Sequence, residues 1–383
     1  MKEIEDSIYI HPVKSHTTTL ETSLSAIEHN YDHYKAMLED NQRIIAMVKA
    51  SSYGAGDAPI ARVLLDKGVY ALSVAYVDEG VTLREEGIEG RIIVLNADDE
   101  SFDAMIDNHL EPEIYSPRSL STFISALENH LAHHYPIHLK IDSGMHRLGV
   151  DETMLDDIYK LLASAGDTIR VDTIFSHLSC ADVPEKDDYT RTQLSIFTSL
   201  ADKIESHLGY KPLRHIAASA AMARFEQAHM DISRLGIGLY GFGTEAEHLK
   251  IASTLKSRIM QIKSYPSGTQ IGYGGASVLE RDSRIATIPI GYADGFNRKL
   301  GCGGWSVVVG DTLAPTVGRI CMDSAMIDIT GIEGVEEGDT VEIFSPRAGH
   351  TADDMARVLG TISYEVLTSI SKRVKRIYTK GEF

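Results

Sequence analysis

Up to about residue 245, hydrophobic and polar positions alternate in a regular way. Short runs rich in Ile and Val are each followed by a segment with helical spacing that ends at Gly or Asn. The runs are at 44–49, 71–76, 91–96, 112–116, 137–142, 171–178, 214–219 and 231–235, and helical spacing is clearest at 58–68, 78–87, 116–132 and 151–166. Strands that alternate with helices predict a parallel sheet. Eight such units favour a closed (β/α)8 barrel, with a doubly wound open sheet as the alternative.

The pattern changes after about residue 245. The later segments are β-rich, punctuated by Gly and poor in helices until 351–360; they lie at 285–295, 306–318, 324–331 and 338–344. This succession of β-rich segments separated by glycines predicts a separate antiparallel β domain. The sequence therefore predicts an N-terminal segment (1–14) that packs on the β domain, a barrel (15–245) and the β domain itself (246–383).

The net charge of the chain argues against two classes of function, nucleic-acid binding and membrane binding. Lys and Arg number 37 against 55 Asp and Glu, which gives a formal net charge of −18. An acidic surface repels nucleic-acid backbones and anionic lipids, so we expect neither nucleic acid nor membrane as a partner. Cys180, Cys302 and Cys321 form no C-x-x-C pair, and the first residues contain no apolar run typical of a signal peptide. These features predict a cytoplasmic protein.

Polar residues stand at the ends of the predicted strands, where the chemistry of barrel enzymes gathers. They are Lys49, Tyr76, Asn96, Ser116, Asp142, His177, Ser219 and Arg234. Gly236-Ile237-Gly238 follows the last strand, and its backbone N–H groups together with the Ser219 hydroxyl would suit a phosphate. A strand-end lysine facing a phosphate site is typical of pyridoxal 5′-phosphate held as a Schiff base. An exposed lysine without such a role is the alternative for Lys49.

Two other motifs would indicate a different function, but the surrounding sequence does not support either of them. Gly236-x-Gly238-x-x-Gly241 matches a dinucleotide-binding fingerprint, but no helix of suitable length is predicted after it. His29 and His33 have a spacing that suits a metal on a helix, yet no third ligand is evident and a solvated helix face is the simpler interpretation. The sequence therefore predicts no metal site.

Several segments resemble the alanine racemase family, in the order in which that family has them. They are VKASSYGAG (48–56), HLKIDSGMHRLG (138–149), FSH (175–177), RLGI (234–237), IGYADG (290–295), VGRICMD (317–323) and SYEV (363–366). The likeness is nearest to a subgroup in which the racemase is fused behind a cell-wall ligase. The resemblance implies a barrel plus a β domain, pyridoxal 5′-phosphate, and a homodimer with shared active sites. It also implies interconversion of L-alanine and D-alanine that supplies peptidoglycan.

The resemblance also implies the roles of individual residues. Lys49 would bind the cofactor and act as one acid/base, Tyr292 of the partner subunit would be the other, and His177 would assist Tyr292. Arg234 would face the pyridine nitrogen and keep it unprotonated. The phosphate would contact a set of residues consisting of Tyr53, Ser219, Gly236, Ile237 and Tyr364.

The substrate carboxylate would be bound by Arg147 and by the Met322 backbone N–H. The family often carries a carbamylated lysine at the position of Lys140, where the added negative charge would orient Arg147. An unmodified lysine held by Asp142 is the alternative.

Some positions depart from the family pattern. Ala218 stands where an Asn usually precedes the phosphate serine, Ala55 replaces a His, and His146 replaces a Gly beside Arg147. These departures bear on rate and substrate preference more than on reaction type. A broader racemase that also accepts serine, a decarboxylase of the same fold, and a non-catalytic pyridoxal-phosphate-binding module remain alternatives. Arg234 argues against the decarboxylase, because such enzymes place a carboxylate at that position.

Overall fold

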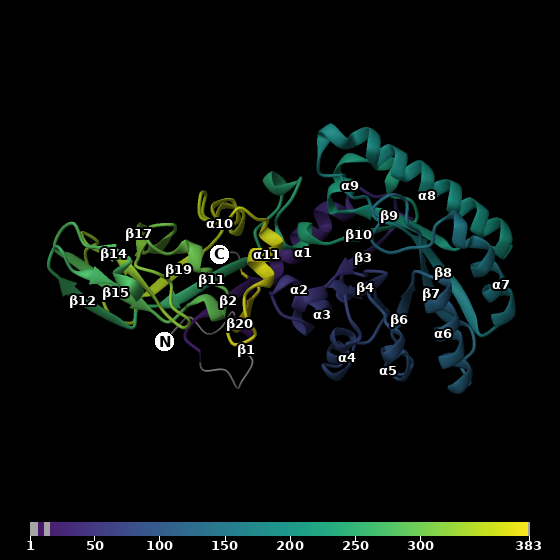
Figure 1. Cartoon of the computed structure of the whole chain (residues 1–383), viewed down its shortest axis with the longest axis horizontal. Helices are drawn as coiled ribbons and strands as arrows, with labels where there is room; N and C mark the ends of the chain where they lie inside the picture. The colour runs from purple at the N-terminus through teal and green to yellow at the C-terminus, as the bar shows by residue number, and fades with distance from the viewer. Residues whose placement is uncertain (1–6, 11–15, 382–383) are drawn as a thin grey trace. The chain divides into compact units, whose positions relative to one another are not determined.

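Eight parallel strands form a closed barrel in the order β10-β3-β4-β5-β6-β7-β8-β9 (Figure 1). We describe residues 7–10 and 16–381 from a computed structural model. The barrel strands are β3 (Arg43–Met47), β4 (Ala71–Val74), β5 (Ile92–Val94), β6 (Glu111–Ile114), β7 (Tyr135–Lys140), β8 (Ile169–Phe175), β9 (Leu213–Ala218) and β10 (Ile232–Leu235). Each predicted strand is present, so the (β/α)8 barrel is confirmed and the open sheet is wrong.

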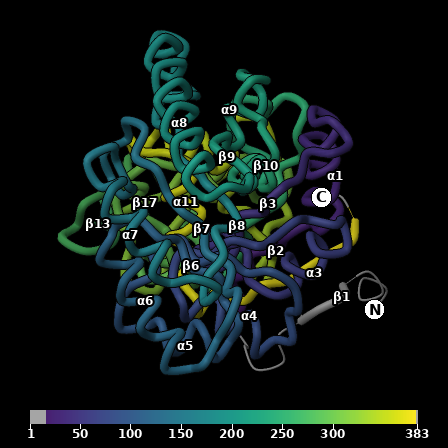
Figure 2. The backbone as a smooth tube through the Cα atoms, turned by 90° about the vertical axis from the view of Figure 1, so that its right-hand side faces the viewer, coloured from purple at the N-terminus to yellow at the C-terminus, as the bar shows by residue number. Residues whose placement is uncertain are grey.

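Helices follow the barrel strands along the chain and lie outside them, as Figure 2 shows for α4 to α8. They are α3 (Ala58–Asp66), α4 (Val77–Glu85), α5 (Phe102–Asp107), α6 (Pro117–Asn129), α7 (Leu155–Ala165), α8 (Asp187–Leu208) and α9 (Ser219–Arg224). α6 shows why such segments fold as helices. Ser116 accepts a hydrogen bond from the Ser119 N–H, Pro117 occupies the first turn, and Leu120, Phe123 and Leu127 are buried at helical spacing.

A ten-stranded sheet forms the second part of the chain, in the order β1-β20-β2-β11-β19-β16-β17-β18-β15-β12. Its strands are β1 (Ser7–Ile10), β20 (Lys375–Thr379), β2 (Thr19–Ser23), β11 (Ser253–Arg258), β19 (Thr340–Phe344), β16 (Ser306–Val309), β17 (Thr312–Val317), β18 (Ala325–Asp328), β15 (Ser283–Ile288) and β12 (Gln261–Tyr265). Neighbouring strands are antiparallel except β2 and β20. Helices α10 (Ala352–Leu359) and α11 (Ser363–Thr368) interrupt the strands near the C-terminus. The predicted antiparallel β domain is confirmed.

The division of the chain differs from the predicted boundaries near the N-terminus. β2 was expected within the barrel, but it pairs with β11 and β20 in the ten-stranded sheet. The barrel is already closed by the pairing of β10 with β3, so it has no free edge for a further strand. One compact unit therefore contains the described residues up to Ile27, Tyr53–Gly56 and everything from Lys250 onward, and the other contains Glu28–Ser52 and Asp57–Leu249.

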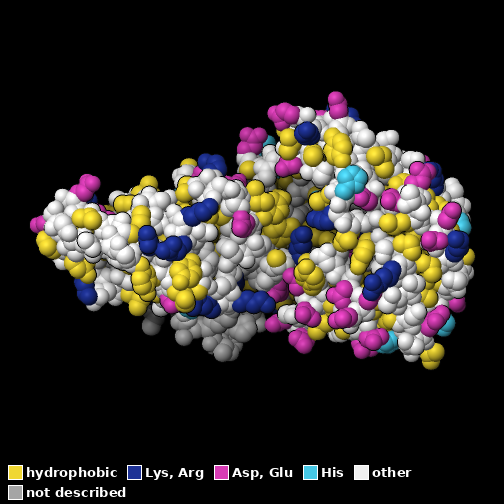
Figure 3. Space-filling view, in the orientation of Figure 1, with side chains coloured by type: hydrophobic (Ala, Val, Ile, Leu, Met, Phe, Trp, Pro, Cys, Tyr) yellow, Lys and Arg dark blue, Asp and Glu magenta, His cyan; other side chains and the backbone are white. Residues whose placement is uncertain are grey.

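The predicted N-terminal segment, 1–14, is described only at β1, which pairs antiparallel with β20. The rest of that segment lies outside the described residues. In the part of the chain that the structure describes, no helix has the length and apolar character needed to cross a membrane. On the face drawn in Figure 3, acidic and basic side chains are interspersed over the surface.

Candidate functional site

Lys49 lies just beyond the end of β3, at the start of a tight left-handed turn. The turn, α2 (Lys49–Tyr53), has positive φ angles at its last residues, from Ala50 (52°) to Tyr53 (55°). Left-handed backbone costs roughly 1–2 kcal/mol for each such residue, so the surrounding structure must hold it. The Ser52 N–H donates to the Val48 carbonyl (2.8 Å), and the Ala50 N–H donates to Glu79 (2.6 Å). The strain falls directly beside the predicted cofactor lysine.

The Lys49 amine is partly buried and makes no hydrogen bond or ion pair with any described residue. Burial lowers its pKa below the ordinary value, and Glu79 opposes this effect. The nearby cations that lower the pKa further are Arg147, Arg234 and Lys140. A lysine in this setting spends more time as the neutral amine, which is the form that attacks a carbonyl carbon.

A second feature of the barrel unit is a group of donors at the start of α9. The Ser219 hydroxyl oxygen accepts hydrogen bonds from the backbone N–H groups of Gly236 (3.0 Å) and Gly238 (3.3 Å). A Cβ at Gly238 would lie 2.4 Å from the Tyr34 ring, so only glycine fits there. Ile237 is buried between the two glycines. Two N–H groups and a hydroxyl that converge in this way suit a phosphate.

Arg234 is buried in β10, and its guanidinium is held by a set of acceptors. Nη1 donates to His215 Nδ1 (2.8 Å), while Nη2 donates to the Ser176 carbonyl (2.7 Å) and to His177 Nδ1 (3.1 Å). Burial lowers the pKa of Arg234 to about 10, so the group remains charged at neutral pH. Its Nε–H has no partner among the described residues.

His177 is held as a neutral imidazole with a defined tautomer. Burial, followed by the charge of Arg234, lowers the pKa of His177 to about 3. An arginine only donates hydrogen bonds, so His177 Nδ1 must accept and the proton must be on Nε2. His177 therefore offers an N–H donor rather than a base.

Arg234 also begins a hydrogen-bonded set of side chains that crosses neighbouring barrel strands, here called the interior network: Arg234, His215, Thr173, His138 and Glu111. His215 Nε2 lies 2.9 Å from Thr173 Oγ1, and Thr173 Oγ1 lies 2.8 Å from His138 Nδ1. His138 Nε2 lies 2.8 Å from Glu111 Oε2. Each residue after Arg234 is on the strand next to that of the residue before it.

The chemistry of the partners gives the direction of each bond in the interior network. Because Arg234 donates to Nδ1 of His215, a neutral His215 carries its proton on Nε2 and donates to Thr173. The Thr173 hydroxyl hydrogen is then free to donate to His138 Nδ1, and in that arrangement His138 Nε2–H donates to Glu111. Burial alone would raise the pKa of Glu111, but hydrogen bonds from His138 and Arg91 hold it below its usual range, so the carboxylate accepts.

Thr173→Val should interrupt the interior network and destabilise the barrel. Valine has a similar shape but leaves His215 Nε2–H and His138 Nδ1 without partners, at a cost of about 1–3 kcal/mol for each buried group. We expect a lower thermal unfolding midpoint and altered tautomers of both histidines, measured by ¹⁵N NMR of the imidazole rings. Thr173→Ser keeps the hydroxyl and should retain the wild-type tautomers. Unchanged tautomers in the valine variant would contradict the assigned directions.

Arg147 lies in the loop after β7, which Asp142 organises. The Asp142 carboxylate accepts hydrogen bonds from the N–H groups of Gly144 (2.9 Å) and His146 (3.0 Å). Burial alone would raise the pKa of Asp142, but these bonds keep it below its usual range. His146 has a positive φ of 55°, a conformation that glycine adopts more easily. The Arg147 guanidinium is exposed and bonds to no described residue, so it is available to an anion.

Lys140 is placed differently from the alternative that paired it with Asp142. Asp142 is engaged with the loop backbone, whereas Lys140 Nζ donates to Glu113 Oε1 at 2.8 Å. Both side chains are buried. The expectation that Asp142 holds Lys140 is therefore wrong, because the Asp142 oxygens already cap the Arg147 loop.

Tyr292 and Met322 lie in the other unit, where backbone bonds hold their two loops together. The Tyr292 N–H donates to the Cys321 carbonyl (3.0 Å), and the Ala293 N–H donates to the Met322 carbonyl (3.0 Å). A Cβ at Gly291 would lie 2.2 Å from the Met322 carbonyl oxygen, so this close approach requires glycine. Tyr292 is 44% exposed and Met322 is 53% exposed.

An ionic clamp fixes the same two loops. Arg373 donates from Nε to Asp294 (2.6 Å), which follows Tyr292 in the chain, and from Nη2 to Asp323 (2.7 Å), which follows Met322. Asp294 is fully buried and also accepts from the Gly291 N–H at 2.8 Å. The positions of Tyr292 and Met322 are thus linked through a single arginine.

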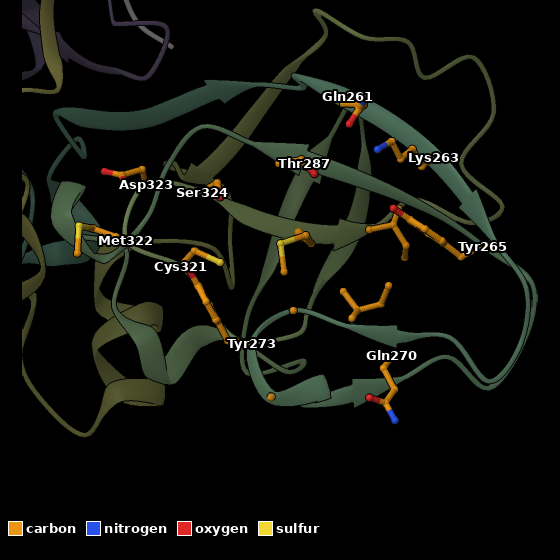
Figure 4. Close-up of a pocket in the computed structure, with 15 residues that line it drawn as sticks. Gln261, Lys263, Tyr265, Gln270, Tyr273, Thr287, Cys321, Met322, Asp323 and Ser324 are labelled. Carbon is orange, nitrogen blue, oxygen red and sulfur yellow. The ribbon is translucent and has the colours of Figure 1, made fainter.

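A hollow of about 720 Å³ in this unit is lined in part by Met322. Figure 4 shows the residues that line it. Cys321, Asp323 and Tyr273 also line it, and Tyr273 is 69% exposed. In the same unit the Tyr53 ring lies 5.8 Å from the Tyr364 ring. The predicted role of these two tyrosines at a phosphate stays a prediction.

The structure thus distributes the predicted site residues over both units. The barrel unit carries Lys49, Lys140, Arg147, His177, Ser219, Arg234, Gly236 and Ile237, whereas the other unit carries Tyr53, Tyr292, Met322 and Tyr364. His29 and His33 contact the His248 carbonyl (3.2 Å) and Glu245 (3.3 Å). Among the described residues, no group of three or more His, Cys, Asp or Glu is arranged to hold a metal ion.

Two models of known protein families match nearly the whole chain. The family model "Alanine racemase, N-terminal domain" matches residues 22–243, and "Alanine racemase, C-terminal domain" matches residues 252–378. The chain belongs to the alanine racemase family. The resemblance found in the sequence is therefore confirmed, and with it the expectation of an isomerase.

Other alanine racemases resemble this chain over almost their full length. The enzyme of Clostridium tetani is 37% identical over 374 residues, covering 94% of this chain and 95% of that protein. The alanine racemase of Methanococcus maripaludis is 35% identical, covering 95% of this chain and 99% of that protein. Among solved structures, alanine racemase of Clostridium difficile 630 has a TM-score of 0.89 at 32% identity, covering 96% of this chain and 97% of that chain.

Two further solved alanine racemases contain bound ligands. The Bacillus anthracis enzyme, with bound L-Ala-P, has a TM-score of 0.87 at 30% identity and covers 95% of each chain. The Bartonella henselae enzyme, with covalently bound pyridoxal phosphate, has a TM-score of 0.82 at 27% identity, covering 94% of this chain and 99% of that chain.

Sequence reasoning missed several residues of this alanine racemase. Glu111 and Glu113 alternate along β6, and His138 and Lys140 alternate along β7, so each pair lies on one face of its strand. Charged residues with a period of two in neighbouring buried strands are a sign of a polar interior. This alternation is visible in the sequence and could have identified these four residues.

Proposed function

We propose that this alanine racemase interconverts L- and D-alanine with pyridoxal 5′-phosphate bound through Lys49. The observation that carries the proposal is the Lys49 amine, which is partly buried, has a lowered pKa and bonds to no described residue. Such an amine is suited to bind a carbonyl group covalently. The pyridoxal phosphate bound covalently to the Bartonella henselae enzyme supports the same chemistry here.

The donor set of the barrel unit fits this cofactor. Ser219 and the N–H groups of Gly236 and Gly238 would hold the phosphate, and the Arg234 Nε–H would face the pyridine nitrogen. Because Arg234 stays charged, it cannot accept a proton and would keep that nitrogen unprotonated. When bound, the cofactor would supply a ring that withdraws electrons from the substrate Cα. We further propose that Ile237, Tyr53 and Tyr364 contact the phosphate.

Racemisation needs a proton donor or acceptor on each face of the substrate Cα. Lys49 would serve one face, and Tyr292 of the partner subunit would serve the other. His177 would donate its Nε2–H to the phenol oxygen of that tyrosine, which stabilises the phenolate and makes the tyrosine a stronger acid. The exposure of Tyr292 and the rigid turn that carries it support a role outside its own unit.

The substrate carboxylate would be held by Arg147 and by the Met322 N–H. Neither donor has a hydrogen-bond partner among the described residues, so both are available. Guanidinium binds carboxylate in a two-point geometry, which fixes the orientation of the substrate Cα. In a homodimer built this way each active site would combine two subunits. The D-alanine produced would supply peptidoglycan.

Incubation with L-alanine tests the proposed reaction. We expect optical rotation to decay to zero from either enantiomer without release of CO₂, because the residues named above move protons and leave the carboxylate bound. Release of CO₂ would instead support the decarboxylase, and an unchanged substrate would support the binding module. Serine, tested in parallel, determines whether the broader racemase is the better description.

A further inference from the structure

A buried ion pair occupies the barrel beside the proposed site, between neighbouring strands β6 and β7. Lys140 Nζ donates to Glu113 Oε1 at 2.8 Å. Glu113 is 0% exposed and Lys140 is 6% exposed. The second carboxylate oxygen, Glu113 Oε2, is also buried and has no hydrogen-bond partner among the described residues. A buried carboxylate with an unused oxygen is costly unless positive charge surrounds it.

Positive charge does surround this carboxylate. Lys140 Nζ and the Arg234 guanidinium carbon each lie 5.4 Å from the centre of the Phe175 ring. Burial raises the pKa of Glu113, and Lys140, Arg147 and Arg234 counteract that effect. Burial lowers the pKa of Lys140, and Glu113 counteracts that effect. Each member of the pair therefore favours the charged form of the other.

We propose that Lys140 remains an unmodified ammonium and that Glu113, as a positioning residue paired with it, supplies the negative charge beside Arg147. The ion pair itself does not depend on the proposed reaction. The expected effect on substrate binding does rest on the proposed function, because it acts through Arg147.

The alternative is carbamylation of Lys140, and the pair opposes it in two ways. In that reaction the neutral amine attacks the carbon of CO₂, an N–C bond forms, an electron pair of one C=O bond moves to oxygen, and one N–H proton leaves to water. The amine must first lose a proton that Glu113 helps it to keep. The product would then place a second anion against the Glu113 carboxylate in a buried setting, where like charges repel strongly.

The test is ¹³C NMR of the intact protein equilibrated with ¹³C-bicarbonate. We expect the wild type to show no carbamate carbonyl signal. Glu113→Gln should show one, because Lys140 then loses its counter-ion, its pKa falls, and the neutral amine can react. Adding Lys140→Met to Glu113→Gln should remove the signal, which assigns it to Lys140.

Glu111→Gln is the matched control, since it makes the same change two residues earlier on the same face of β6. Glu111 bonds to His138 and Arg91 rather than to a lysine, so this variant should show no Lys140 carbamate. A carbamate signal in the wild type that disappears in Lys140→Met would overturn the proposal. A folded Glu113→Gln protein without the signal would also overturn it.

Kinetics provide a second measurement. The wild-type KM for alanine should not change with bicarbonate. In Glu113→Gln the KM should rise roughly tenfold, the effect of losing one charged contact, with a smaller change in kcat. Bicarbonate should lower that KM again, because a carbamate would restore the missing anion; a bicarbonate-independent KM would count against the proposal. If the wild type proves inactive on alanine, the proposed function fails while the NMR result still decides the state of Lys140.

Discussion

Lys49→Ala is expected to abolish racemisation of both alanine enantiomers, with a loss of roughly 10⁴-fold or more, because it removes both the cofactor attachment and one acid/base group. The purified wild type, supplied with pyridoxal 5′-phosphate, should absorb visible light. Borohydride should then fix the cofactor to the peptide that contains Lys49. The alanine variant should show neither property. Activity measured from each enantiomer and mass analysis of the reduced peptides provide the result.

Lys160→Ala is the control for this experiment. Lys160 is an exposed helix residue that pairs with Asp157 at 3.0 Å, so its loss should change neither activity nor labelling. Recovery of the cofactor on a lysine other than Lys49 would contradict the site.

Tyr292→Phe is expected to slow the loss of α-deuterium from one alanine enantiomer far more than from the other. The reason is that only one face of the substrate Cα would lose its acid/base group, while Lys49 continues to serve the other face. The measurement is α-deuterium exchange followed separately for L- and D-alanine by NMR. Equal slowing of both enantiomers would argue against two bases on opposite faces.

The same variant tests whether the active site is shared. When Lys49→Ala and Tyr292→Phe chains are mixed and allowed to exchange, about a quarter of all sites in a twofold dimer would contain both intact residues. Partial activity should therefore return, whereas each variant alone should remain inactive. Chains that exchange, as shown by mass spectrometry of tagged dimers, without any recovery of activity would exclude a site built from two subunits.

The fold could be predicted because its signal is repetitive. Most barrel strands contain buried Ile, Leu or Val and are followed by a helix, and the repetition predicts both the strand direction and the closure. β2 could not be assigned in the same way. Its sequence, TLETS, precedes a helix just as the barrel strands do, and only its pairing with β11 and β20 distinguishes it.

The site was predictable to the extent that its residues stand at strand ends. His177, Ser219 and Arg234 all follow that rule, and the structure brings them together in one unit. The left-handed turn after Lys49 could not be foreseen, because Ala and Ser normally avoid positive φ. The pairing of Lys140 with Glu113 was missed for a different reason. Asp142 is nearer in sequence, and only the register of β6 against β7 shows which carboxylate is nearer in space.

The interior network has a consequence for where protons enter the enzyme. A proton can pass along a row of hydrogen bonds only if every donor and acceptor exchanges roles behind it. Arg234 cannot act as an acceptor, and Glu111 at the far end is held ionised, so the donors of His215, Thr173 and His138 are held in a single orientation. The row of hydrogen bonds from Arg234 to Glu111 is therefore not expected to relay protons along the barrel interior, and protons exchanged at the proposed site should arrive from the side of the strand ends that carry Lys49 and Arg147.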